Sequence, residues 1–168
     1  MTEPPKNRHW LWFFAVLTVL AFGAVVGNWY YNLSQQLTPE QLQAAEDLWK
    51  KNGPRDYDLH IVREVSGANS SGEPAHEELL AKVRNGKVVM VTLNGRPLEP
   101  RLFPEYDVEA WFDFIERFLE IDHQPGAPRT FTRARFAPTD GHILEYVRRV
   151  SGTRERQSFR TEVLPPSD

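Results

Sequence analysis

The pattern of apolar and polar residues divides the chain into one uninterrupted apolar stretch and a longer region of mixed polarity. No Asp, Glu, Lys or Arg occurs between Arg8 and Glu40, and within this gap residues 10–27 are apolar apart from Thr18. These 18 residues form about 27 Å of helix, close to the roughly 30 Å hydrocarbon core of a bilayer. The pattern therefore predicts a helix that spans a membrane once.

Aromatic residues lie at both ends of this stretch, as in helices that cross two membrane interfaces. A buried core helix would not normally carry aromatic residues at both ends and apolar residues on every face. We therefore assign residues 10–31 to a transmembrane helix. The residues expected to lie within the membrane are Trp10, Leu11, Trp12, Phe13, Phe14, Leu17, Leu20, Phe22, Val25, Val26 and Trp29.

The flanking charges predict the orientation of this helix. Lys6 and Arg8 precede it, whereas no Lys or Arg follows it until Lys50. The positive-inside rule places residues 1–9 in the cytoplasm and residues 38–164 on the other side of the cytoplasmic membrane. A cleaved signal peptide is the alternative, because the two cations form a short basic region before the apolar one. Cleavage near the small residues at 21–23 would leave part of the apolar run behind, which favours an uncleaved signal-anchor.

Beyond a linker at residues 32–37, helical periodicity predicts two amphipathic helices. Thr38 is a suitable N-cap for the first, Pro39 suits its first position and Gln41 completes a capping box. Asp107 is a suitable N-cap for the second. The apolar positions of the first helix are Leu42, Ala45, Leu48 and Trp49. Those of the second are Val108, Trp111, Phe112, Ile115, Phe118 and Leu119.

Alternating patterns and turn residues predict six strands. Asn85-Gly86 is a strong hairpin signal, because both residues tolerate positive φ. The prolines at 97, 100 and 104 predict an extended connection before the second helix. The expected strands cover residues 57–61, 79–84, 87–93, 130–136, 143–150 and 157–163. Connections of this length favour an α+β domain of order α-βββ-α-βββ, with a mainly antiparallel sheet and helices on one face.

Five short segments of this domain resemble a family of uncharacterised bacterial exported domains, often lipoproteins, with no established activity. They are Leu48-Trp49, Tyr57-Asp58-Leu59, residues 84–89, residues 107–112 and residues 136–141. The resemblance covers residues 38–163 and implies a protein of the bacterial envelope. Members often carry a lipidation cysteine and a cysteine pair, whereas this chain has no cysteine. A transmembrane anchor would replace the lipid, and the resemblance implies no catalytic residue.

The composition excludes several classes of chemistry. The 168 residues include no cysteine, so disulfides, thiolate metal sites and a cysteine nucleophile are excluded. The net charge of −3 is too small to suggest nucleic acid as a partner. Ser70 and Ser71 lie in a Gly- and Ser-rich loop without the surroundings of a nucleophile elbow. We expect no cofactor.

Histidines leave one enzymatic alternative open. His76 begins a segment that resembles a zinc-protease motif, but position 80 is Leu where the second ligand should stand. His60 and His142 could be neighbours across the sheet, with Asp58 or Glu145 near them. Such a pair could bind a metal or act as acid and base in a membrane-tethered hydrolase. Solvent-facing positions on alternating strands are the favoured interpretation of both histidines.

Charge is distributed unevenly along the predicted domain. Residues 38–123 carry a net charge of −7, and residues 124–168 carry +3, with arginine as their only basic residue type. On paired strands several arginines could form one basic face, unless the acidic half of the domain neutralises it. The candidates for partner binding are Arg133, Arg135, Arg148, Arg149, Arg154 and Arg156. Guanidinium groups bind carboxylate and phosphate with two hydrogen bonds, so the expected partner is an acidic protein or lipid headgroups.

Overall fold

The computed structural model describes residues 9–67 and 74–167, together with their side chains except those of residues 9, 11 and 28–34. The predicted loop serines, Ser70 and Ser71, lie outside the described residues. The chain divides into two compact parts, one ending at Gln36 and the other beginning at Leu37.

Helix α1 (His9–Ser34) contains the apolar stretch. Its described large apolar side chains are 43–72% exposed. Thr18, the one polar residue of the run, donates its hydroxyl to the carbonyl of Phe14 at 2.8 Å. Among the described side chains, which leave out residues 11 and 28–34, no helix is both long enough and apolar enough to cross a membrane. Helix α1 continues to Ser34, three residues into the segment that was predicted to be a linker, residues 32–37.

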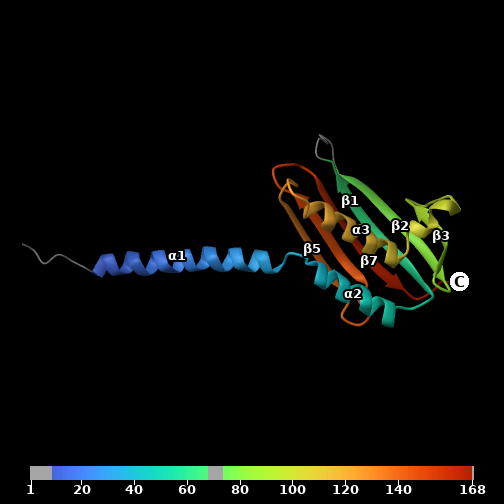
Figure 1. Ribbon diagram of the computed structural model, residues 1–168, viewed down its shortest axis with the longest axis horizontal. Coiled ribbons are helices and arrows are strands. Elements are labelled where there is room, and N and C mark those ends of the chain that lie inside the picture. Colours follow the sequence, from blue (N-terminus) through green and yellow to red (C-terminus); the bar gives the residue numbers. More distant parts are fainter. Residues whose placement is uncertain (1–8, 68–73, 168) are drawn as a thin grey trace, which may run out of the picture. The chain divides into compact units, whose positions relative to one another are not determined.

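The second part is an α+β domain built on one antiparallel sheet of seven strands (Figure 1). The strand order is β4-β3-β2-β1-β7-β6-β5, so the two halves of the domain meet where β1 pairs with β7. The strands are β1 (Tyr57–Ser66), β2 (Ala75–Arg84), β3 (Lys87–Leu93), β4 (Arg96–Pro97), β5 (Thr130–Phe136), β6 (Ile143–Val150) and β7 (Arg156–Leu164).

Helices α2 (Pro39–Asn52) and α3 (Val108–Asp122) cover one face of this sheet (Figure 1). The predicted caps are confirmed: the Thr38 side chain accepts from Gln41 N in a capping box, and that of Asp107 accepts from Ala110 N. The helices and the covered strand face share one core. Its most deeply buried side chains include Leu59, Ile61, Phe112, Ile115, Ile143 and Tyr146. No helix of the described residues 37–67 and 74–167 covers the opposite sheet face, which is called the open face below.

The turn chemistry explains how neighbouring strands are joined. Asn85 and Gly86 both adopt positive φ, 52° and 69°, which confirms the predicted hairpin between β2 and β3. The extended connection predicted from three prolines was wrong in part. Residues 96 and 97 form the short edge strand β4, and η1 (Pro100–Glu105) is a 3-10 helix. Proline suits the first turn of a helix as well as extended chain, so composition alone did not distinguish the two.

Candidate functional site

Five arginines lie on the open face of β5, β6 and β7. Side chains alternate between sheet faces along a strand, and Glu145 on β6 pairs with arginines of both neighbouring strands, which places all of these side chains on one face. We call this surface the arginine face, and its arginines are all exposed. Its members are Arg133 and Arg135 on β5, Arg149 on β6, and Arg156 and Arg160 on β7.

Glu145 is the acidic residue at the centre of this surface. Its carboxylate lies 3.2 Å from Arg135 Nε and 3.7 Å from Arg160 Nε. Among the described residues, no ion pair is found for Arg133, Arg149 or Arg156. The guanidinium groups of these three arginines are therefore available to an external anion. Those of Arg135 and Arg160 are available as well, because a single exposed ion pair contributes little to stability.

A shallow hollow of about 300 Å³ lies on the same face. Val62 and Val147 contribute apolar surface to it, Arg156 and Arg160 contribute positive charge, and Glu64 and Glu145 contribute negative charge. The hollow therefore has a mixed charge, and the arginines without an ion pair lie on the surface around it. Arg160 was not among the predicted residues. Its position four residues after Arg156 in a strand was the available signal, because residues i, i+2 and i+4 share a face.

Arg148 does not belong to the arginine face, and its prediction as a partner-binding residue is corrected. It is 4% exposed on the helix-covered side, where its guanidinium binds Asp122 at 2.6 and 2.9 Å and Glu155 at 2.7 Å. It also stacks over the ring of Phe118, 4.7 Å from the ring centroid. Hydrogen bonds to Asp122 raise the pKa of Arg148 above its ordinary value, against the opposing effect of burial. This arginine is part of the interior.

Arg154 lies between β6 and β7 rather than on a strand, and it is exposed. The structure therefore brings together Arg133, Arg135, Arg149 and Arg156 of the six predicted residues.

The two histidines of the enzymatic alternative are held by different carboxylates. His60 Nε2 lies 2.8 Å from Glu78 Oε1 on β2, and this pair is exposed to solvent. His142 Nδ1 lies 2.7 Å from Asp140 Oδ1, and its ring meets the ring of Trp49 edge-on. His60 lies on β1, His142 precedes β6, and β7 lies between these strands. The structure does not bring the two histidines together as that alternative required.

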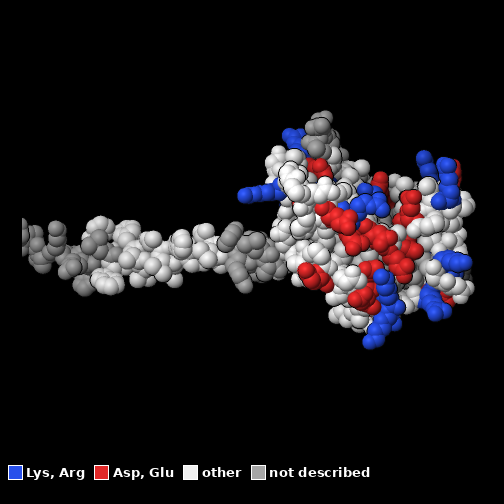
Figure 2. Space-filling model, in the orientation of Figure 1, with Lys and Arg blue, Asp and Glu red and all other residues white. Residues whose placement is uncertain are grey.

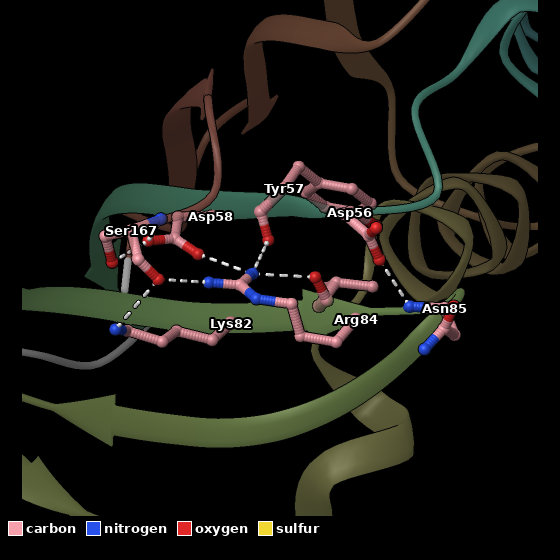
Figure 3. A network of polar contacts seen from close by, with 8 residues as sticks. Asp56, Tyr57, Asp58, Lys82, Arg84, Asn85 and Ser167 are labelled. Carbon is pink, nitrogen blue, oxygen red and sulfur yellow. Dashed lines mark hydrogen bonds and ion pairs between the residues drawn. The ribbon is translucent and has the colours of Figure 1, made fainter.

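Asp58 belongs to a separate network of hydrogen bonds (Figure 3). Its carboxylate accepts hydrogen bonds from Arg84 at 2.8 Å, from the backbone N–H of Ser167 at 3.1 Å and from the Ser167 hydroxyl. Burial acts to raise the pKa of Asp58, but the hydrogen bonds from Ser167 and Arg84 outweigh it and lower the pKa. Asp58 on β1 thus hydrogen-bonds to Arg84 on β2 and to Ser167, and it does not pair with a histidine.

No group of three or more His, Cys, Asp or Glu side chains in residues 9–67 and 74–167 has an arrangement that could hold a metal ion. His76, the first residue of the zinc-like segment, is exposed near the start of strand β2. The segment is a strand, so His76 and Leu80 point from the open face, whereas the zinc motif requires one face of a helix.

The fold defines an α+β protein with a seven-stranded antiparallel sheet. No protein-family model, no curated protein and no solved structure matches the chain.

Proposed function

We propose that this protein is anchored in a membrane by α1 and that its α+β domain binds anionic lipid headgroups through the arginine face. The observation that carries this function is the gathering of five exposed arginines on one face of β5, β6 and β7, of which two form ion pairs with Glu145. The domain would lie outside the cytoplasm, as the flanking charges predict.

The sequence and the exposed side chains of α1 support the anchor. The helix has 26 residues, contains no Asp, Glu, Lys or Arg, and carries aromatic residues near both ends. Its large apolar side chains are exposed along the whole described length rather than along one face. A helix that is apolar on all sides is stable in hydrocarbon and unfavourable in water.

The chemistry of the guanidinium group supports headgroups as the anion. Phosphate accepts two hydrogen bonds from guanidinium. Arg133, Arg149 and Arg156 are exposed and form no ion pair among the described residues, so their guanidinium groups are free to bind phosphate.

A fluorophore on the arginine face tests this function. The chain has no cysteine, so Glu162→Cys, on the open face beside Arg160, provides one labelling site. The full chain is placed in nanodiscs of zwitterionic or anionic lipid whose headgroups carry a quencher. We expect stronger quenching in the anionic nanodiscs, because the arginines then hold this face against the headgroups. A label at Gln43→Cys on α2 should not respond to lipid charge.

Two charge-reversal variants distinguish the arginine face from general electrostatics. In Arg133→Glu/Arg149→Glu/Arg156→Glu the response to anionic lipid should disappear. The control, Arg55→Glu/Arg96→Glu/Arg101→Glu, changes net charge equally at exposed arginines elsewhere and should keep the response. Equal losses in both variants would contradict the proposal. So would a face that captures soluble polyglutamate and ignores lipid charge.

A further inference from the structure

A groove of about 700 Å³ lies between the first half of α2 and the second half of α3. Leu42 from α2 and Phe112 and Leu119 from α3 give it an apolar floor. Its volume falls within the range of pockets that bind ligands in proteins. The groove opens on the outer side of the helices, away from the sheet and from the arginine face.

Carboxylates line both walls of this groove. They are Glu40, Glu46 and Asp47 on α2, and Glu116 and Glu120 on α3. Figure 2 shows Asp and Glu side chains gathered along α3 and at the start of α2, with uncharged surface between them.

Most of this negative charge is unpaired. Lys50 binds Glu46 at 2.6 Å, and no cation among the described residues forms an ion pair with the other four carboxylates. Hydrogen bonds from the backbone at the start of α2 and from Thr38 lower the pKa of Glu40, so this carboxylate is charged at neutral pH. The groove therefore presents an apolar strip between two rows of anions.

The spacing of the rows specifies the shape of a complementary ligand. Glu116 and Glu120 are one turn apart, about 6 Å along α3, and Glu40 and Asp47 are two turns apart, about 10 Å along α2. A helix with an apolar stripe and Lys or Arg on both sides of it presents the matching pattern. A second copy of this domain presents its arginines on the strands of a sheet, which is too broad to enter the space between two helices.

We propose that the groove between α2 and α3 docks a cationic amphipathic helix of a partner protein. Apolar side chains of the ligand at positions i, i+3 or i+4, and i+7 rest on Leu42, Phe112 and Leu119. Lys and Arg beside that stripe pair with the carboxylates of the two walls. This site is separate from the arginine face and does not require it.

The test uses the full chain in zwitterionic nanodiscs and a fluorescent synthetic peptide of Leu and Lys in helical periodicity. Fluorescence anisotropy measures binding, with empty nanodiscs as the blank. Glu116→Lys/Glu120→Lys should weaken binding about tenfold, because one wall then repels the peptide. Both positions are exposed on α3, so the variant should keep its circular dichroism spectrum and its melting temperature.

Three controls make the proposal falsifiable. Glu64→Lys/Glu162→Lys alters charge equally on the open face and should bind the peptide as the parent chain does. The triple arginine-to-glutamate variant of the arginine face should also bind normally, so failure of the headgroup proposal leaves this test intact. A peptide with Ser in place of Leu should bind far more weakly. Equal loss in both Glu→Lys variants, or equal binding of the two peptides, would overturn the proposal.

Discussion

Arg148 and Arg149 are neighbours in the chain with opposite surroundings. Arg148 points towards α3, where it lies between Asp122 and Glu155 and over the ring of Phe118. Arg149 points from the open face and is exposed. Consecutive side chains of a strand point to opposite faces of the sheet. Arg148 is therefore buried in an ion-pair network, whereas Arg149 faces the solvent.

Replacing each arginine by alanine should give very different stabilities. Arg148→Ala leaves the carboxylate of Asp122, itself 5% exposed, without its partner. We expect a loss of about 3 to 5 kcal/mol in the free energy of unfolding. Arg149→Ala should change it by less than about 0.5 kcal/mol. Urea titrations in nanodiscs provide the measurement, and similar losses in the two variants would contradict the assigned faces.

Tyr57 gives a prediction for alkaline pH. Burial raises its pKa from 10.0 to about 12, partly offset by the hydrogen bond that its hydroxyl accepts from Val108 N at 3.4 Å. Folding thus favours the neutral phenol, whose contribution to stability is complete below pH 10 and is lost as the pH rises towards 12. The free energy of unfolding of Tyr57→Phe relative to the parent should rise by about 2 kcal/mol between pH 9 and 12. A difference that stays constant over this range would argue against a buried phenol.

At the scale of elements, the turn before β6 packs closely against α2. Gly141 has φ 82°, and a Cβ there would lie 2.2 Å from the carbonyl oxygen of Ala45. Gly86, in the β2–β3 hairpin, has φ 69° and open space around it. The two glycines share the conformational requirement but differ in packing.

Alanine at these two positions separates conformation from packing. Gly86→Ala should cost about 1 kcal/mol, the usual penalty of a left-handed conformation for alanine. Gly141→Ala should cost more than about 3 kcal/mol, because α2 must also move away. Thermal melting of the two variants supplies the comparison. Equal shifts in melting temperature would contradict the close approach of residue 141 to α2.

The sequence predicted both domain helices and most strands because their signals are local. Caps at Thr38 and Asp107 and the turn at Asn85-Gly86 act within a few residues. The pairing of β1 with β7 was not predictable in this way, since it joins segments about 100 residues apart. The position of Arg148 was missed for the same reason, because its partner Asp122 lies on another element. Counting charges identified the arginine-rich segment, but it did not show which arginines point to the open face and which point to the core.

At the scale of the whole domain, charge is separated between two surfaces. Carboxylates gather on the helical layer, and five arginines lie on the open face of the sheet. Glu64 of the acidic half lies beside Arg156 and Arg160 on the open face, so the acidic half offsets part of the arginine charge. Two oppositely charged surfaces suit a protein that contacts anionic headgroups with one side and a cationic segment with the other.

The proposed function requires that α1 crosses a membrane once and that the domain lies outside the cytoplasm. Single cysteines at Thr2→Cys and Gln43→Cys, expressed in a bacterial host, test it with a membrane-impermeant maleimide. In cells with a permeabilised outer membrane and an intact inner one, we predict labelling at residue 43 and none at residue 2. Both sites should react after lysis, and the protein should resist alkaline extraction. Labelling of both sites before lysis, or release by alkali, would contradict the account.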